Sequence, residues 1–223
     1  MLFPEKITLI QAADRVLEIG PGALPHFRSN AFLELNFDNN ADRVSQRGGI
    51  AGSTDLGGRP VHYYEGKQFP FTDRQFDYVI CSHVIEHVID PQFFLSEVFR
   101  VGGGRGYLEY PLVTYDYLYD FDVHLQLVKF DFERRVFQYL PKQDTALQQF
   151  ASISSFFRKS LEYGWDDLCA ANKRLFFEGF EFNRPFAVEP ASDLQALLPD
   201  SSLIVRKGKV RRLADRIMNK LRL

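Results

Sequence analysis

The sequence predicts a single α/β domain built on a mainly parallel β-sheet with helices on both faces. Short apolar runs, each typical of a buried parallel strand, recur along the first half of the chain. Turns, polar stretches and an amphipathic helix separate them, and this alternation of strand and helix is typical of βαβ units. A length of 223 residues with 45% hydrophobic content suffices for one domain with its own core.

The elements of the first half follow one another in a regular order. The first strand is expected over residues 15–19, where RVLEI ends in the tight turn Gly20-Pro21-Gly22. Further strands are expected over 31–35 and 76–81. Residues 91–101 predict a helix, because their apolar side chains recur on one helical face; three glycines end it before a strand at 106–110.

The second half of the chain is richer in aromatic residues. Within residues 112–140, VKF-DFERR-VFQYL predicts two strands joined by a polar turn, which is the pattern of an antiparallel hairpin. A helix is expected over 145–163 and one or two late strands over 174–188. We find no internal repeat and no low-complexity linker, so the whole chain, 1–223, is expected to form one domain.

Composition limits the class of protein. No stretch approaches the roughly 18 consecutive apolar residues of a membrane-spanning helix, and the first residues lack a signal-peptide pattern, so we expect a cytoplasmic location. Cys81 and Cys169 are too few for a disulfide framework and predict reduced, buried thiols. The net charge is −2. Because the body of the chain is acidic, nucleic acid is not expected as the main partner.

A basic amphipathic helix is expected at 206–223. This tail carries a charge of +7 and leaves −9 on the rest of the chain, and Leu213, Ile217 and Leu221 share one of its sides. Two interpretations stay open. The tail packs on its own domain or on a partner subunit, or it makes a peripheral contact with an anionic membrane or a polyanionic glycolipid. The oligomeric state is not predicted.

The most informative loop is VLEIGPGALP. Glu18 precedes Gly20 and Gly22, and the missing side chains at these glycines let a ligand lie against the backbone. A dinucleotide loop would need a third glycine, where this chain has Pro25. An acid at this point would repel a pyrophosphate but suits a ligand with a positive amino group and a sulfonium.

With these motifs the chain resembles the class I S-adenosylmethionine-dependent methyltransferases, in the branch that reads LEIGxGxxP and LPFxDxxFDxVxxSHVLEHVxDP. The matching stretches are Leu17 to Pro25, Phe69 to Val88 and Asp90-Pro91, and the resemblance covers about residues 14–125. It implies a Rossmann-like sheet, with a cofactor-binding half at 1–111 and an acceptor-side half at 112–205. It also implies S-adenosylmethionine as the cofactor.

The resemblance assigns roles to residues of the cofactor-binding half. The methionine portion of the cofactor would lie on the loop formed by Glu18, Gly20, Pro21 and Gly22. Glu34, at the end of the second strand, would bind both ribose hydroxyls, because two carboxylate oxygens suit a cis-diol; Asp38 is the alternative. Glu65 falls where the family usually has an aspartate near the adenine amino group.

The stretch Ser82-His83-Val84-Ile85-Glu86-His87 has two interpretations. As HxxEH it matches a zinc-peptidase motif, which implies a zinc hydrolase using His83, Glu86 and His87. That motif must lie within a helix, whereas here a strand ends at Cys81. The resemblance instead makes Ser82 and His83 the floor of the cofactor pocket, with Glu86 and His87 orienting the next helix. No metal is therefore expected.

The function expected from these features is methyl transfer from S-adenosylmethionine by in-line displacement. The acceptor would be a small molecule, a sugar or a lipid-linked intermediate, and its reacting atom is not predicted. A general base, where one is needed, would come from His83, Glu109 or His124. A second interpretation is a non-catalytic protein that binds S-adenosylmethionine or acts as a scaffold.

Overall fold

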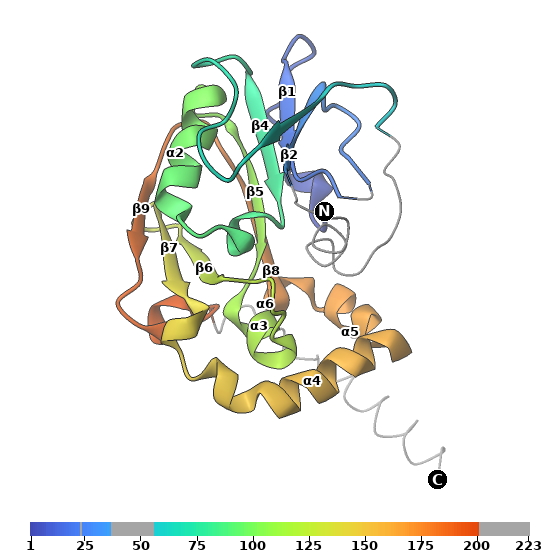
Figure 1. Cartoon of the computed structure of the whole chain (residues 1–223), viewed down its shortest axis with the longest axis vertical. Coiled ribbons are helices and arrows are strands. Elements are labelled where there is room, and N and C mark those ends of the chain that lie inside the picture. The colour runs from blue at the N-terminus through green and yellow to red at the C-terminus, as the bar shows by residue number, and fades with distance from the viewer. Residues whose placement is uncertain (23, 37–55, 201–223) are drawn as a thin grey trace, which may run out of the picture.

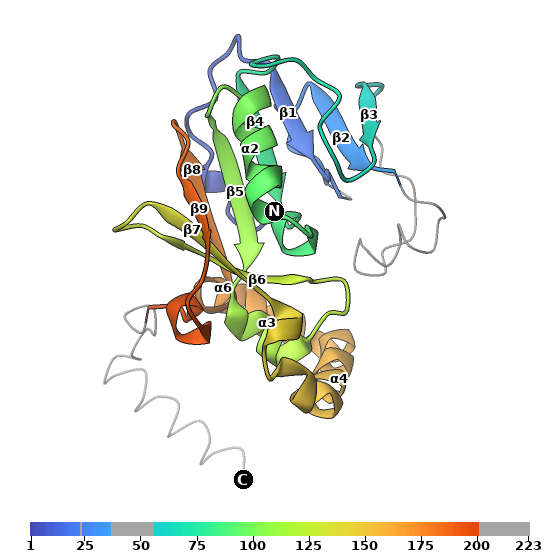
Figure 2. The same cartoon turned by 60° about the vertical axis from the view of Figure 1, so that its left-hand side comes forward.

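A computed structural model of the protein describes residues 1–22, 24–36 and 56–200. Its centre is a six-stranded sheet in the order β3-β2-β1-β4-β5-β8 (Figures 1 and 2). Strands β1 to β5 run parallel to their neighbours, and β8 pairs with β5 in the antiparallel direction. The predicted α/β class with a mainly parallel sheet is confirmed.

The bounds of the elements are as follows. The strands of the main sheet are Val16–Ile19 (β1), Ala31–Leu35 (β2), Val61–Tyr64 (β3), Tyr78–Ser82 (β4), Gly106–Pro111 (β5) and Phe177–Phe182 (β8). A three-stranded sheet contains Gln126–Asp131 (β6), Val136–Pro141 (β7) and Ala187–Pro190 (β9). The α-helices are Pro91–Val101 (α2), Val113–Tyr119 (α3), Ala151–Ser160 (α4), Asp166–Ala171 (α5) and Lys173–Phe176 (α6). Single turns lie at Pro4–Lys6 (η1), Ile85–His87 (η2), Lys142–Asp144 (η3), Leu147–Phe150 (η4), Leu161–Trp165 (η5) and Leu194–Leu197 (η6).

Helix α2 covers one face of the main sheet. The Asp90 side chain accepts a hydrogen bond from the Phe93 amide and so caps the helix, and Pro91 occupies its first turn, where its missing N–H costs nothing. The apolar stripe of α2 is buried in the same core as alternate side chains of β1, β4 and β5. This stripe consists of Phe94, Leu95, Val98 and Val101. The helix therefore forms at the predicted residues and for the predicted reason.

The opposite face of the sheet packs against the N-terminal segment. Met1, Ile7 and Ile10 contact a cluster formed by Val16, Tyr78, Ile80 and Tyr107. Helices were expected on both faces, and within the described residues this segment, which holds only the short turn η1, lies where the second layer was expected. The physical reason is the short link between β1 and β2, because Asn30 already bonds to the first residue of β1.

The second half of the chain adds a small sheet and a group of helices below the main sheet (Figure 1). The predicted hairpin is confirmed, because β6 and β7 pair antiparallel from Gln126–Pro141 to Asp131–Val136. Phe130 and Phe137 of this hairpin belong to the same buried core as α2. The two halves thus share one hydrophobic core.

Several predicted elements differ from the structure. The edge strand β3 and the helix α3 were not predicted, and the helix expected over 145–163 is α4, which ends at Ser160. Both cysteines are free and buried, as predicted. No helix in the described part of the chain is long and apolar enough to cross a bilayer. The predicted basic tail, 206–223, lies outside the described residues.

Candidate functional site

The loops after β1 and β4 meet at one edge of the main sheet. Ile19 of β1 lies opposite Cys81 of β4, and Ser82 lies opposite Glu109 of β5. From β1 the chain proceeds to β2 and β3 on one side, whereas β4 leads to β5 on the other. Such a reversal of strand order leaves a crevice outside the carboxyl ends of the strands, where open α/β sheets bind ligands.

The glycine loop lines this crevice with bare backbone. Gly20 has φ +60° and Gly22 has φ +59°, in the left-handed region that other residues rarely adopt. A Cβ at Gly20 would lie 2.7 Å from Cγ2 of Val84, so the β1 loop packs directly on the loop after β4. A Cβ at Gly22 would meet no atom within 4 Å. Gly20 is therefore required by packing, whereas the space beside Gly22 is open to a ligand.

Glu18 holds the glycine loop in shape. Its side chain is buried and accepts hydrogen bonds from the Ser29 hydroxyl (2.6 Å) and the His26 amide (2.8 Å). Burial raises the pKa of this carboxyl above its usual range, against the effect of those two hydrogen bonds. These contacts fix the return of the chain toward β2. Direct contact between Glu18 and a methionine portion stays a prediction.

Two further predicted acids lie along the same edge. Glu34 lies near the end of β2, where it pairs with Tyr63 of β3. Glu65 follows β3, is exposed, and accepts a hydrogen bond from the side-chain amide of Asn36 at 2.7 Å. Glu34 therefore lies near the carboxyl end of β2, and Glu65 directly follows the carboxyl end of the neighbouring strand β3. Asp38, the alternative to Glu34, lies outside the described residues.

His83 is held by acids on both sides of its ring. Its Nε2 lies 3.1 Å from Oε1 of Glu109, and its Nδ1 lies 3.5 Å from Oε1 of Glu86. Burial disfavours the imidazolium, but the neighbouring carboxylates of Glu109 and Glu86 outweigh this and raise the pKa of His83 to about 9. A protonated imidazole has no lone pair, so this arrangement does not favour the predicted role of His83 as a general base.

Glu109 is a buried acceptor with many donors. Its carboxylate accepts hydrogen bonds from the amides of Leu2 (2.7 Å) and Phe3 (2.9 Å), and from the hydroxyls of Tyr107 (2.6 Å) and Ser82 (2.9 Å). Burial opposes ionisation, yet these donors and His83 hold its pKa at about 2. The side chain is 0% exposed. Glu109 is thus a positioning residue rather than the base that was considered.

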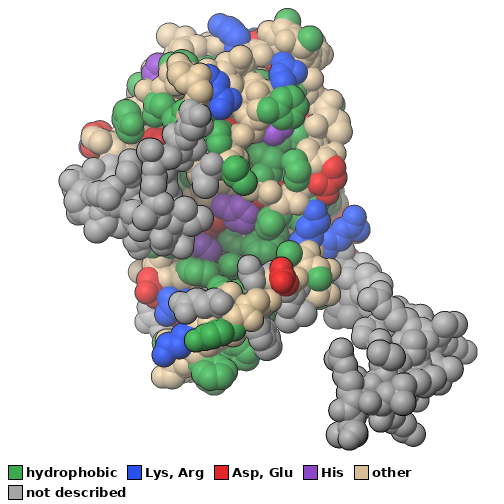
Figure 3. Space-filling model, turned by 90° about the vertical axis from the view of Figure 1, so that its right-hand side faces the viewer, with side chains coloured by type: hydrophobic (Ala, Val, Ile, Leu, Met, Phe, Trp, Pro, Cys, Tyr) green, Lys and Arg blue, Asp and Glu red, His purple; other side chains and the backbone are tan. Residues whose placement is uncertain are grey.

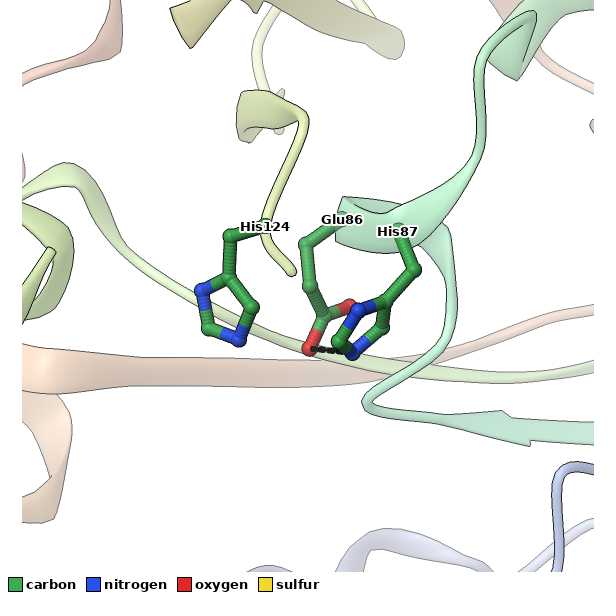
Figure 4. A group of neighbouring side chains, drawn as sticks. All are labelled: Glu86, His87 and His124. Carbon is green, nitrogen blue, oxygen red and sulfur yellow. Dashed lines mark ion pairs between the residues drawn. The ribbon is translucent and has the colours of Figure 1, made fainter. Parts of the chain in front are cut away.

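A second group of side chains lies beside His83. Glu86, His87 and His124 place a carboxylate oxygen and two ring nitrogens within 4.8 Å of one another (Figure 4). Glu86 and His87 belong to η2, and His124 comes from the loop before β6. The Leu125 amide donates a hydrogen bond to the Glu86 carbonyl at 2.7 Å and so joins these two segments.

A family comparison covers part of the chain that holds these residues. Residues 34–109 match the sequence model of a family described as Methyltransferase domain. The matched stretch is less than half of the chain, and over that stretch the chain is similar to a methyltransferase domain. It runs from β2 to β5 and includes five of the predicted site residues: Glu34, Glu65, Ser82, His83 and Glu109. The match confirms the resemblance to class I S-adenosylmethionine-dependent methyltransferases. Membership of the narrower branch, defined by the LEIGxGxxP and LPFxDxxFDxVxxSHVLEHVxDP motifs, stays a prediction.

Solved structures with similarity to this chain include three proteins. They are an S-adenosylmethionine-dependent methyltransferase from Thermotoga maritima (22% identity, TM-score 0.33, 49% of each chain covered), one from Methanosarcina mazei (19%, 0.35, 59% of this chain and 73% of that one) and the YcgJ protein of Bacillus subtilis (14%, 0.40, 79% and 94%). The chain spans about half the length of the Thermotoga maritima protein. No curated protein matched.

The described residues around His83 form no helical zinc-peptidase motif. His83 has φ +55° and precedes η2, which is a single 3-10 turn at Ile85–His87. Two of the three residues of that motif, Glu86 and His87, instead lie beside His124, which is far away in the sequence. No local pattern in the sequence could have brought His124 to this group, because the connection through α3 places it there.

Proposed function

We propose that this chain binds S-adenosylmethionine at the crevice outside β1 and β4 and transfers its methyl group to an acceptor bound between the main sheet and the second half of the chain. The observation that carries the proposal is the glycine loop. Its two left-handed glycines lie at the reversal of strand order, and the backbone at Gly22 faces open space.

The residues at this edge of the sheet offer chemical groups that suit S-adenosylmethionine. Gly20, Pro21 and Gly22 offer bare backbone for its methionine portion, and the carboxylate of Glu34 offers two acceptors for the ribose hydroxyls. Glu65 directly follows the next strand, accepts a hydrogen bond from Asn36, and would contact the adenine. When bound, the cofactor supplies a methyl group on a positive sulfonium, and the sulfur keeps the bonding electron pair when the methyl leaves.

The acceptor side is supported by the surface between the two halves. Figure 3 shows a hollow there in which histidine and hydrophobic side chains gather. His83, His87 and His124 are the histidines at the join between β4, η2 and the loop before β6. Aligning an acceptor in such a site and excluding water supply much of the rate of a displacement reaction.

Among the three predicted bases, His124 has one ring nitrogen that is not bonded to a carboxylate. Its Nδ1 donates to Oδ1 of Asp116 at 2.6 Å, because an ionised carboxylate can only accept. The Nε2 atom of a neutral His124 then carries the lone pair. This nitrogen can accept a proton from the acceptor or bind a metal ion.

Calorimetric titration with S-adenosylmethionine and S-adenosylhomocysteine tests the proposal. Gly22→Ala should weaken binding at least tenfold, because its methyl group would enter the space assigned to the cofactor. Gly58→Ala is the matched control. It has φ +69° and equally open surroundings but lies at the opposite edge of the sheet, before β3, so binding should change less than twofold.

Two results would overturn the proposal. One is no binding of either compound by the unaltered chain, and the other is equal loss in both glycine variants. Transfer itself is measured as release of S-adenosylhomocysteine when hydroxyl compounds are added. If the chain binds the cofactor but no S-adenosylhomocysteine is released with any acceptor, the result would favour the non-catalytic interpretation.

A further inference from the structure

We propose that Glu86, His87 and His124 form a binding site for one divalent transition-metal ion. The ligand atoms would be a carboxylate oxygen of Glu86 and the Nε2 atoms of both histidines. No metal was expected from the sequence, because the zinc-peptidase interpretation used His83 and placed the motif on a helix. The structure brings together a different set.

The first argument is geometric. The three ligand groups lie within 4.8 Å of one another and come from two segments joined by a backbone hydrogen bond. The rings of His87 and His124 are 4.9 Å apart and nearly perpendicular, at 86°. Figure 4 shows the carboxylate of Glu86 between the two rings, with a ring nitrogen of each histidine directed toward it. One ion between them could contact all three.

The second argument concerns the far side of each ring. The Nδ1 of His87 donates to the Val123 carbonyl at 2.9 Å, and the Nδ1 of His124 donates to Asp116 at 2.6 Å. Metal-bound histidines are generally fixed in this way, by a carbonyl or carboxylate that holds the proton on the other nitrogen and orients the ring. Each Nε2 is thereby left with its lone pair toward Glu86.

The third argument is the state of the Glu86 carboxylate. Its side chain is 1% exposed, and neither oxygen has a hydrogen-bond partner in the described part of the chain. The nearest nitrogens, of His83 and His87, are 3.5 and 3.8 Å from Oε1, too far for good hydrogen bonds. A buried charge without such bonds is costly unless it is paired or coordinates a metal. His83 lies on one side of this carboxylate, and a divalent cation on the side of His87 and His124 would give its oxygens the direct contacts that they lack.

The ligand set indicates the class of metal. Two imidazoles and one carboxylate suit first-row transition ions such as Zn²⁺, Co²⁺ or Mn²⁺, whereas Mg²⁺ and Ca²⁺ prefer oxygen ligands alone. Three protein ligands leave coordination positions open, as in catalytic rather than structural sites.

The position of the site deepens the proposed function, on which this step depends. Val84, two residues before Glu86, packs on Gly20 of the glycine loop. An ion at Glu86 would therefore lie beside the proposed cofactor edge. Its open positions would take an oxygen ligand and lower the pKa of a bound hydroxyl. We thus assign the acceptor to the hydroxyl compounds, which a metal can hold through oxygen.

The test measures metal binding without any cofactor. The full chain is treated with EDTA and dialysed, and Co²⁺ or Zn²⁺ is titrated by visible absorption and calorimetry, with Mg²⁺ for comparison. We expect one ion per chain. Glu86→Gln and His124→Ala should weaken binding at least tenfold, and Asp116→Asn, which alters only the support of His124, should weaken it by about 10–100-fold.

His62→Ala is the control. His62 is on β3, outside the group, where it packs edge-on against Phe71, so its loss should leave the metal affinity unchanged. Circular dichroism checks the fold of each variant, and Glu86→Gln is nearly isosteric should His124→Ala fail to fold. The proposal is overturned if the unaltered chain binds no Co²⁺ or Zn²⁺ at micromolar concentrations, or if Glu86→Gln binds them equally well. Such a result would leave Glu86 and His87 as an internal ion pair only.

Titration with S-adenosylhomocysteine in EDTA separates this proposal from the proposed function. Cofactor binding without metal binding would leave methyl transfer standing and remove the metal. Metal binding without cofactor binding would leave the metal site standing and remove the proposed methyl transfer.

Discussion

Replacing Glu109 by glutamine should separate the structural role of this residue from a catalytic one. The carboxylate lies at the centre of the molecule's best-connected polar group, where amides of the N-terminal segment, the Tyr107 hydroxyl and His83 all point at it. Glutamine has nearly the same shape but carries no charge and presents an N–H₂ group toward donors. The substitution therefore removes the charge-assisted hydrogen bonds with little change in volume.

The magnitude follows from the pKa of the buried group. In the folded chain the pKa of Glu109 is lowered from 4.5 to about 2. At about 1.4 kcal/mol per unit, its ionised form contributes about 3 kcal/mol to the free energy of unfolding at neutral pH. Because the folded pKa is the lower one, this contribution is present above pH 4.5 and is lost as the pH falls toward 2. The His83 interaction is included in this figure and is not added again.

Urea denaturation between pH 3.5 and 6, in the presence of EDTA, measures the effect. Glu109→Gln should lower the free energy of unfolding by about 3 kcal/mol at pH 6 and by about 2 kcal/mol at pH 3.5. Glu133→Gln, in the exposed turn between β6 and β7, is the control and should change it by less than about 0.5 kcal/mol at either pH. A deficit below about 1 kcal/mol at pH 6, or one that does not shrink on acidification, would refute the reasoning.

Two more substitutions probe the framework of the site. Glu97→Gln should lower the free energy of unfolding in urea by about 1–3 kcal/mol. Glu97 is buried and accepts hydrogen bonds from the Phe69 amide at 2.8 Å and from the guanidinium of Arg100. An unchanged free energy of unfolding would show that these hydrogen bonds do not stabilise the fold. Gly20→Ala should melt at a lower temperature than Gly22→Ala. Both substitutions cost about 1–2 kcal/mol for the left-handed backbone, but only the first places a methyl group 2.7 Å from Val84, and equal melting temperatures would contradict this.

The sequence patterns predicted the buried elements well and the exposed ones poorly. Strands β1, β2 and β4 are continuous apolar runs, and α2 has both a cap and an apolar stripe, so their local signals agree with the fold. Strand β3, VHYY, is partly exposed at the edge of the sheet and shows no such run. The helix predicted over 145–163 begins later, at Ala151, and continues after Ser160 as the irregular turn η5, in which Tyr163 and Gly164 leave helical backbone angles.

The candidate site was predicted where its residues are close in sequence. The glycine loop and the Ser82-His83 turn follow strand ends, and the carboxyl ends of parallel strands necessarily meet at one edge. The role of Glu109 could not be predicted, because its donors Leu2 and Phe3 arrive from a segment with no recognisable pattern. The HxxEH pattern contains two residues of the proposed metal site, Glu86 and His87, but their third partner, His124, is brought to them by tertiary contacts that the pattern does not include.

The N-terminal segment also constrains how the chain can fold during synthesis. The Lys6 ammonium donates to the Gly179 carbonyl at 2.6 Å, and the Leu9 amide donates to Glu181 at 2.9 Å, so both partners belong to β8. A ribosome that adds about 5–20 residues per second completes β8 on the order of ten seconds or more after the segment. Until then the face of the sheet formed by Tyr78 and Tyr107 lacks its full cover. We expect nascent chains stalled before β8 to be held by chaperones, and chains released after it to become protease-resistant in one step.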